Sequence, residues 1–130
     1  MLKVFVDAGF RNASGKGAFA FVIFDSAGNQ VAGHATCALG TSNELEYQAA
    51  IAGLKRAVEI AGGEKVLLQT DSQLVEKQLL GDYKVRKNHL KPLHATLTEL
   101  VQRSGAKVEW IPRKQNRAHK LVEQALQKTC

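Results

Sequence analysis

Three carboxylic acids, Asp7, Glu46 and Asp71, stand at positions from which they could act together as metal ligands. Asp7 and Asp71 each end a short apolar run typical of a strand, and Glu46 lies in the first turns of a long amphipathic helix. An acid at the margin of that helix's apolar stripe is costly unless it is paired or bound to a metal. Carboxylates suit Mg²⁺, and two metal ions about 3.5–4 Å apart can activate a water against a phosphodiester. Spacing alone leaves a second interpretation open, in which these acids are turn or cap residues.

The first half of the chain must supply two of these positions. Three strands are expected there, the second and third forming a hairpin, over residues 3–7, 19–24 and 30–38. Gly, Ser and Asn residues predict a loop over 9–17. An amphipathic helix is expected after Gly40 and ends at Gly62, and Thr41 with Glu44 forms a capping-box signature at its start.

The second half of the chain alternates between strands and helices. Strands are expected at residues 65–70 and 107–111. Two helices are expected between them, one between Ser72 and Gly81 and one marked by Leu90 to Val101, and a last helix is expected at residues 118–126. A strand–helix–strand passage implies a right-handed parallel crossover. We therefore predict an α/β fold with a mixed five-stranded sheet, three antiparallel strands plus a parallel half flanked by helices, in the order β-β-β-α-β-α-α-β-α. Ligand sites in such sheets gather at the carboxyl ends of parallel strands.

The size and composition limit the classes of protein to consider. The 130 residues predict a single domain over 1–130, and 45% hydrophobic with 23% charged residues is ordinary globular composition. No apolar run is long enough for a membrane span, so we expect no membrane association. Two cysteines, Cys37 and Cys130, are too few for a disulfide framework and lack metal-ligand spacing, which favours a reducing, cytoplasmic location. We expect a monomer, because no apolar surface stripe stands out.

The charge is divided unevenly along the chain. The net charge is +6, but residues 84–128 carry eleven basic and three acidic residues, so this segment is +8 and the remainder is −2. Such asymmetry suggests a polyanionic partner. A basic solvated face with no partner is the other interpretation of the same charges.

Four sequence blocks resemble the motifs of the type 1 ribonuclease H family, in the same order and over nearly the whole chain: VFVDAG at 4–9, TSNELEYQA at 41–49, TDSQLV at 70–75 and IPRKQNRAH at 111–119. The resemblance implies a ribonuclease H-like fold and an endoribonuclease that hydrolyses the RNA strand of RNA–DNA hybrids. It also implies Mg²⁺ or Mn²⁺, with two ions during catalysis, and makes Asp7, Glu46 and Asp71 catalytic metal ligands.

The same resemblance, together with the charge pattern, implies a set of substrate contacts. Polar residues near the acids would contact the minor groove and the 2′-hydroxyls of the RNA strand, and basic residues would contact phosphates. The expected set is Asn12, Asn43, Ser72, Gln73, Lys84, Arg86, Lys87, Arg113 and Asn116. Asn12 is also explained as a turn former and Arg113 as a solvated cation. We expect Trp110 to be buried, and His89 and His94 to be exposed near helix ends.

His119 departs from the family pattern, which has an aspartate at this position as the fourth metal-site carboxylate. We include His119 among the catalytic and metal-binding residues, since imidazole ligates softer cations such as Mn²⁺ and can also serve as a general acid or base. Glu123 follows four residues later and is a weaker substitute ligand. A plain surface histidine is the other interpretation of His119. For the protein as a whole, the alternatives are a catalytically weakened or silent nucleic-acid-binding protein of the same fold, with His119 in place of the last carboxylate, or a related exonuclease.

Overall fold

The computed structural model describes residues 1–11 and 15–130, and its centre is a five-stranded sheet in the order β3-β2-β1-β4-β5. The first three strands pair antiparallel, and β4 and β5 continue the sheet in parallel from β1. The strands are β1 (Leu2–Phe10), β2 (Lys16–Phe24), β3 (Gln30–Leu39), β4 (Val66–Thr70) and β5 (Lys107–Trp110). The predicted mixed sheet is therefore confirmed.

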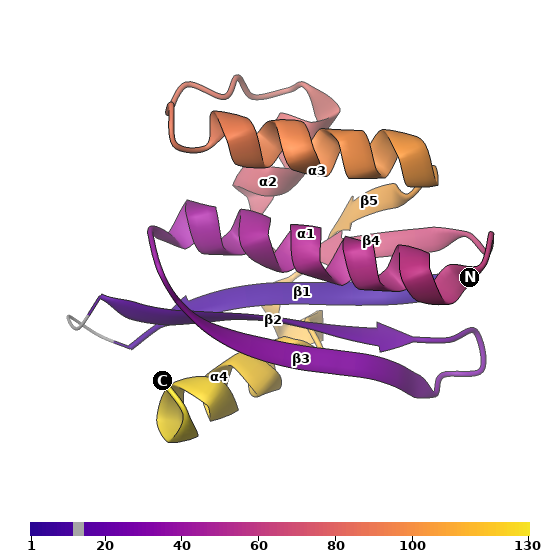
Figure 1. The fold of residues 1–130 in the computed structure, drawn as a ribbon, viewed down its shortest axis with the longest axis horizontal. Helices are drawn as coiled ribbons and strands as arrows, with labels where there is room; N and C mark the ends of the chain where they lie inside the picture. The colour runs from indigo at the N-terminus through magenta and orange to yellow at the C-terminus, as the bar shows by residue number, and fades with distance from the viewer. Residues whose placement is uncertain (12–14) are drawn as a thin grey trace.

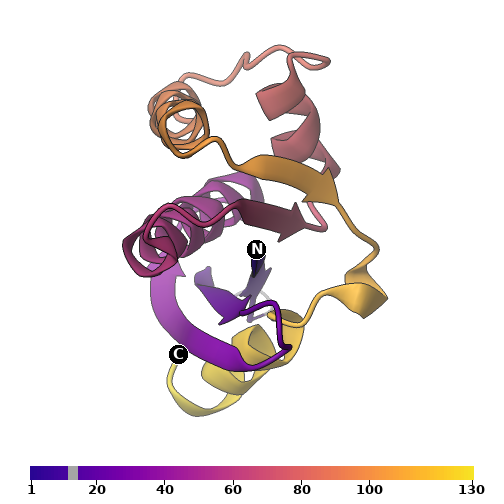
Figure 2. The ribbon, with the colours of Figure 1, turned by 90° about the vertical axis from the view of Figure 1, so that its right-hand side faces the viewer.

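The helices cover the sheet from both sides (Figure 1). On one side α1 crosses β1, β2 and β4, with α3 packed on α1 and α2 beside them. On the opposite side α4 packs against β1, β2 and β3, and Figure 2 shows it beneath the curved sheet. The helical segments are α1 (Ser42–Ala61), α2 (Gln73–Leu80), α3 (Lys91–Ser104), the 3₁₀ turn η2 (Arg113–Gln115) and α4 (His119–Lys128). No helix in the described part of the chain is both long and apolar enough to cross a membrane.

The register of β1 determines where its acid lies. Antiparallel pairing with β2 continues to Phe10 opposite Gly17, so β1 is longer than predicted and both ends of the expected loop, residues 9–10 and 16–17, are strand. Parallel pairing with β4 ends earlier, at Val6 opposite Thr70. Asp7 and Asp71 each come one residue after this last pair. Both therefore stand at the end of the parallel ladder, although Asp7 lies inside β1. Backbone pairing with β2 extends β1 beyond the predicted strand, and residue composition alone does not reveal such an extension.

The predicted capping box at the start of α1 is present. The backbone N–H of Thr41 donates to the Glu44 carboxylate at 2.8 Å, and the N–H of Glu44 donates to the Thr41 hydroxyl at 3.2 Å. The middle of the helix lies close to the sheet, because a Cβ at Gly53 would be only 2.8 Å from a methyl carbon of Val6. Glycine therefore lets α1 lie directly over β1, which brings Glu46 toward Asp7.

The two cysteines form a disulfide, which the sequence argument did not predict. Cys37 on the edge strand β3 is bonded to Cys130, 93 residues later, with 5.5 Å between the Cα atoms. The bond joins the C-terminal end of α4 to the sheet, while Ala118, Val122 and Ala125 bury the inner face of the same helix. The cysteines are too far apart in the sequence for local reasoning to pair them.

Replacing Cys130 with serine is expected to lower the free energy of unfolding by about 3 kcal/mol, because the disulfide closes a long loop in the unfolded chain. Urea unfolding without reductant measures the difference. The parent protein in reductant serves as the control and should unfold at the midpoint of Cys130→Ser. Equal midpoints for the oxidised and reduced parent would contradict a stabilising disulfide.

Candidate metal centre and nucleic-acid interface

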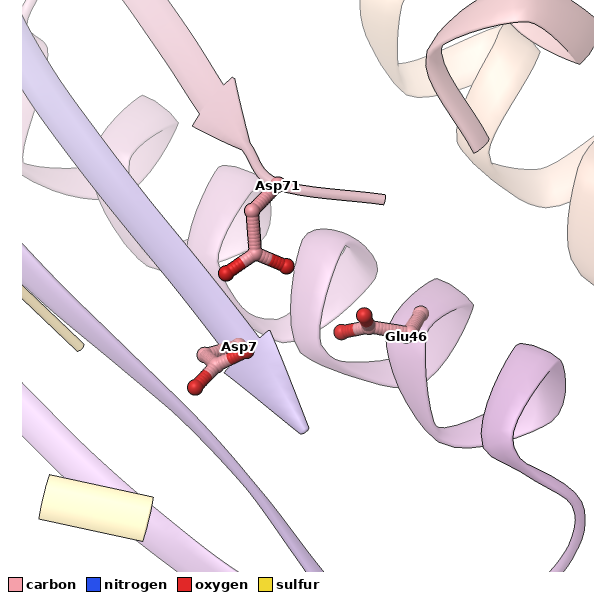
Figure 3. Close-up of side chains that lie close together, drawn as sticks. All are labelled: Asp7, Glu46 and Asp71. Carbon is pink, nitrogen blue, oxygen red and sulfur yellow. The ribbon is translucent and has the colours of Figure 1, made fainter. Parts of the chain in front are cut away.

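The three acids predicted from the sequence converge on one point. Asp7 comes from β1, Asp71 follows β4, and Glu46 projects from the first turns of α1 (Figure 3). One carboxylate oxygen from each residue lies within 4.8 Å of the others. The end of the parallel ladder and the close approach of α1 thus assemble three oxygen donors from distant parts of the chain.

The charges of these acids are poorly solvated and repel one another. Burial, followed by the charge of Asp71, raises the pKa of Asp7 from 3.8 to about 6. Burial, followed by the charges of Asp7 and Asp71, raises the pKa of Glu46 from 4.5 to about 9. The Glu46 Oε1 atom is buried without a hydrogen-bond partner. An orphaned carboxylate oxygen beside two further carboxylates fits a divalent cation, which prefers oxygen ligands and would relieve the repulsion.

Asn116 connects the cluster to the backbone around it. Its side-chain amide nitrogen donates to the Val6 carbonyl at 2.8 Å and to the Asp71 carboxylate at 3.0 Å. Its side-chain oxygen accepts from the N–H of Ala118 at 3.1 Å. Asn116 is buried, which gives it a positioning role rather than the substrate contact expected from the sequence. It holds β1, Asp71 and the start of α4 in one arrangement.

His119 faces the cluster from the first residue of α4. Its Nδ1 lies 3.0 Å from Oδ2 of Asp7, and its Nε2 lies 2.8 Å from Oε1 of Glu123. The interpretation of His119 as a surface residue without contact to the site is therefore wrong. The imidazole lies against Asp7, outside the group of three acids whose ligand atoms lie within 4.8 Å of one another.

Two further residues border the acids. Arg113 in η2 is exposed, and its charge opposes the rise in the pKa of Glu46 that burial causes. Trp110 was expected to be buried, but 39% of it is exposed. It lies on the edge strand β5, and its indole N–H donates to the Asp71 carbonyl at 3.1 Å. Its place on the edge strand accounts for this exposure.

The polar residues expected to contact substrate lie around the same end of the sheet. Asn43 is exposed in the first turn of α1, and Gln73 is exposed at the start of α2. Ser72 is half-buried and caps α2, since its hydroxyl accepts from the Val75 N–H at 3.2 Å. Asn12 lies outside the described residues. Ser72 therefore caps α2 directly after Asp71.

The basic segment lies between α2 and α3. Lys84, Arg86 and Lys87 are all exposed there. The segment is tied to the core through Gln78, whose amide donates to the Lys84 carbonyl at 3.3 Å and whose oxygen accepts from the buried Tyr47 hydroxyl at 2.5 Å. Gln78 was not singled out from the sequence, because a glutamine on the apolar stripe of α2 carries no signal for a contact 31 residues away.

The two histidines of this region differ. His89 is exposed, as expected. His94 is half-buried: its Nε2 lies 3.1 Å from the Gln78 carbonyl and its ring packs edge-on against Tyr47. The expectation of an exposed His94 is wrong, because the first turn of α3 lies against α2 and α1. His94 joins these three helices behind the basic segment.

The chain is similar to known proteins over almost its whole length. A family model described as reverse transcriptase-like matches residues 5–125. Ribonuclease HI of Halobacterium salinarum is 34% identical over 125 residues, which are 94% of this chain and 62% of that protein. Bifunctional protein Rv2228c of Mycobacterium tuberculosis is 33% identical over 113 residues, 85% of this chain and 31% of that protein. The chain thus spans less than two thirds of the length of these relatives.

Three solved structures share the fold. The N-terminal RNase H domain of Rv2228c has a TM-score of 0.88 at 27% identity and covers 97% of this chain and 93% of its own. RNase H1 from Halobacterium salinarum has a TM-score of 0.87 at 27% identity, with 99% and 98% covered. LC11-RNase H1 in complex with an RNA/DNA hybrid has a TM-score of 0.88 at 27% identity, with 98% of both chains covered.

From the acid cluster we predict that the free energy of unfolding falls as pH rises when metal is absent. Asp7 and Glu46 hold protons more tightly in the folded chain than in the unfolded one, so each destabilises the fold above its unfolded pKa, up to about pH 6 for Asp7 and about pH 9 for Glu46. Between pH 5 and pH 8 in EDTA, we expect the parent to lose roughly 3 kcal/mol of unfolding free energy relative to Glu46→Gln. Denaturant unfolding measured along this pH series tests it.

Saturating Mn²⁺ is expected to abolish this difference, because the cation stabilises the ionised cluster. Glu59→Gln is the matched control: Glu59 is exposed on the same helix and should follow the parent. Parallel pH curves for the parent and Glu46→Gln would contradict the repulsion described here.

Proposed function

The chain belongs to the reverse transcriptase-like, ribonuclease H-like family, and from that premise we propose that it is a metal-dependent endoribonuclease that hydrolyses the RNA strand of RNA–DNA hybrids. The observation that carries the proposal is the convergence of Asp7, Glu46 and Asp71 around an unpartnered buried oxygen of Glu46. A relative of the same fold was solved in complex with an RNA/DNA hybrid, which supports the substrate class.

Asp7, Glu46 and Asp71, with His119 beside Asp7, would hold Mg²⁺ or Mn²⁺ in this proposal. When bound, two such ions supply an activated water and stabilisation of the leaving oxygen. The chain's own residues would position the metal-binding carboxylates and neutralise the charge of the substrate. Asn116 keeps Asp71 in place through a hydrogen bond of 3.0 Å. Arg113 is exposed, and its guanidinium would contact a phosphate that approaches the acids.

The recognition of the hybrid is assigned to two sets of exposed groups. Asn43, Ser72 and Gln73 lie next to the acids and would contact the RNA strand through its minor groove and 2′-hydroxyls. Lys84, Arg86 and Lys87 would contact phosphates without reading sequence. Polar contacts near the acids would thus select RNA, while the basic segment would supply affinity.

His119 favours a second candidate, a protein of the same fold that binds nucleic acid without cutting it. An imidazole carries no formal negative charge when neutral, so this cluster has one carboxylate fewer than the family pattern and attracts Mg²⁺ less strongly. The intact group of three acids favours activity. A nitrogen ligand also suits Mn²⁺ better than Mg²⁺. The nuclease is therefore expected to cleave in Mn²⁺, whereas the silent binding protein would cleave in neither metal.

Cleavage of an internally and end-labelled RNA–DNA hybrid, compared in Mg²⁺ and Mn²⁺, distinguishes the candidates. We expect internal cuts in the RNA strand, faster in Mn²⁺, and no cleavage of RNA–RNA or DNA–DNA duplexes. Asp71→Asn should lower the rate about 100-fold or more, because it removes a charge from the metal cluster. His119→Asp should raise the rate in Mg²⁺ relative to Mn²⁺.

Asp82→Asn is the matched control, because Asp82 is an exposed aspartate outside the cluster, and it should cleave like the parent. Binding without cleavage in either metal would support the silent binding protein. Shortening from a strand end would indicate an exonuclease. Cleavage that survives Asp71→Asn would show that these acids are not the active site.

The basic segment predicts a salt-dependent affinity. In the Asp71→Asn background, replacing Lys84, Arg86 and Lys87 with alanine should weaken hybrid binding and reduce the slope of log K against log salt by about 2–3. Fluorescence anisotropy across a salt series measures both. The control replaces three exposed lysines, Lys3 and Lys65 near the other end of the parallel strands and Lys55 on α1, and should leave the slope within about one unit. Equal losses for both triple variants would contradict a specific role for this segment.

A further inference from the structure

The environment of His119 assigns a role to Glu123, a residue that the family motif does not contain. The imidazole lies between two carboxylates, with Nδ1 3.0 Å from Asp7 Oδ2 and Nε2 2.8 Å from Glu123 Oε1. We propose that Glu123 is a positioning residue: it holds the His119 ring so that Nδ1 points to the metal cluster. This inference rests on the proposed function, because it concerns the metal centre of the same site.

Helix geometry explains why the two side chains meet. His119 is the first residue of α4, and Glu123 is four residues further along, which places it one turn away on the same face. The side chains are 4% exposed in Asp7, 29% in His119 and 57% in Glu123. The three groups therefore form a line from the buried cluster to solvent, with the imidazole in the middle.

The ring positions determine which nitrogen faces the cluster, since Nδ1 lies at Asp7 and Nε2 at Glu123. An ionised carboxylate accepts hydrogen bonds and has none to donate, so the contact with Glu123 calls for an N–H on Nε2 and the contact with an ionised Asp7 calls for one on Nδ1. With a cation held at Asp7, the Nδ1 proton would be displaced to solvent, whereas the Nε2 N–H would keep its acceptor in Glu123. The ring is then fixed by its outer nitrogen, and Nδ1 is the one directed at Asp7. Histidine ligands commonly donate their other ring N–H to a carboxylate in this way, which fixes the tautomer and the ring orientation.

The alternative, that Glu123 itself replaces the missing carboxylate, does not fit the geometry. The His119 ring separates Glu123 from Asp7, and Glu123 is the most exposed of the three groups. Among the described residues, the group whose ligand atoms lie within 4.8 Å of one another is Asp7, Glu46 and Asp71, and neither Glu123 nor His119 belongs to it. Glu123 therefore acts on the cluster through the histidine.

The start of α4 is held independently of this contact. The Asn116 side chain accepts from the Ala118 N–H, and the His119 N–H donates to the Asn116 carbonyl at 3.2 Å. Val122 on the inner face of α4 is fully buried, whereas Glu123 is on the outer side. Changing Glu123 should therefore leave the helix in place and free only the imidazole ring.

A double-mutant cycle between Glu123 and His119, read by calorimetric titration with Mn²⁺, tests this role. We expect Glu123→Ala to weaken Mn²⁺ binding about tenfold, the lower end of what loss of such a supporting carboxylate costs. Glu123→Gln keeps an acceptor oxygen and should recover most of the affinity. In the His119→Ala background, Glu123→Ala should have less than about a twofold effect, because the ring on which it acts is gone.

Gln124→Ala and Gln127→Ala, exposed on the same helix, are the controls and should bind Mn²⁺ like the parent. Melting temperatures in EDTA should stay within about 3 °C of the parent for every Glu123 variant, which excludes loss of fold as the cause. A tenfold loss that persists in the His119→Ala background would overturn the proposal, because Glu123 would then act by its charge alone. Unchanged Mn²⁺ affinity in Glu123→Ala would also overturn it.

The titration separates this inference from the proposed function. A parent that cleaves hybrids while Glu123→Ala binds Mn²⁺ normally would refute the role of Glu123 and leave the nuclease intact. A parent that shows the Glu123 effect on Mn²⁺ binding without cutting hybrids would refute the nuclease and leave the positioning role intact.

Discussion

The repulsion among three carboxylates held within 4.8 Å of one another is the constraint on which the rest of the site depends. Register places two of them together, because the parallel pairing of β1 and β4 stops one residue before Asp7 and Asp71. The close packing of α1 on β1, which Gly53 permits, adds Glu46. Hydrophobic packing of the sheet and helix thus stabilises an arrangement that the charges oppose. Burial, followed by this repulsion, raises the pKa of Asp7 and of Glu46.

The position of α4 follows from this constraint. Asn116 binds the Val6 carbonyl, the Asp71 carboxylate and the start of α4 at once, so the helix begins beside the acids. At its other end the Cys37–Cys130 disulfide fixes the helix to β3. A helix held at both ends and buried along its inner face presents its first residue, His119, in a defined place. The departure from the family's aspartate therefore changes the chemistry of the site without loosening its geometry.

Sequence patterns predicted the parts of the site that local physics determines. The Thr41–Glu44 capping box and the position of Asp71 directly after a strand follow from short-range rules, and both were confirmed. Asp7 was expected to end its strand but lies inside β1, at the end of the parallel ladder only. Contacts between distant residues could not be predicted in the same way. The disulfide, the burial of Asn116 and the edge exposure of Trp110 all depend on which elements become neighbours in space. The family motif identified Asn116 and His119 as relevant, but only the fold shows that one positions Asp71 and the other contacts Asp7.

The fold separates the basic residues from the acid cluster. The basic residues between α2 and α3 are exposed, whereas the repelling acids are buried or half-buried at the end of the parallel strands. A phosphate backbone is attracted by the first group and repelled by the second, so cations at the acids would turn a repulsive centre into an attractive one. Under the proposed function, metal binding would therefore decide whether a hybrid held by the basic segment can reach the acids. Replacing the fourth carboxylate with His119 lowers the negative charge that recruits those cations, which makes the orientation of this ring matter more.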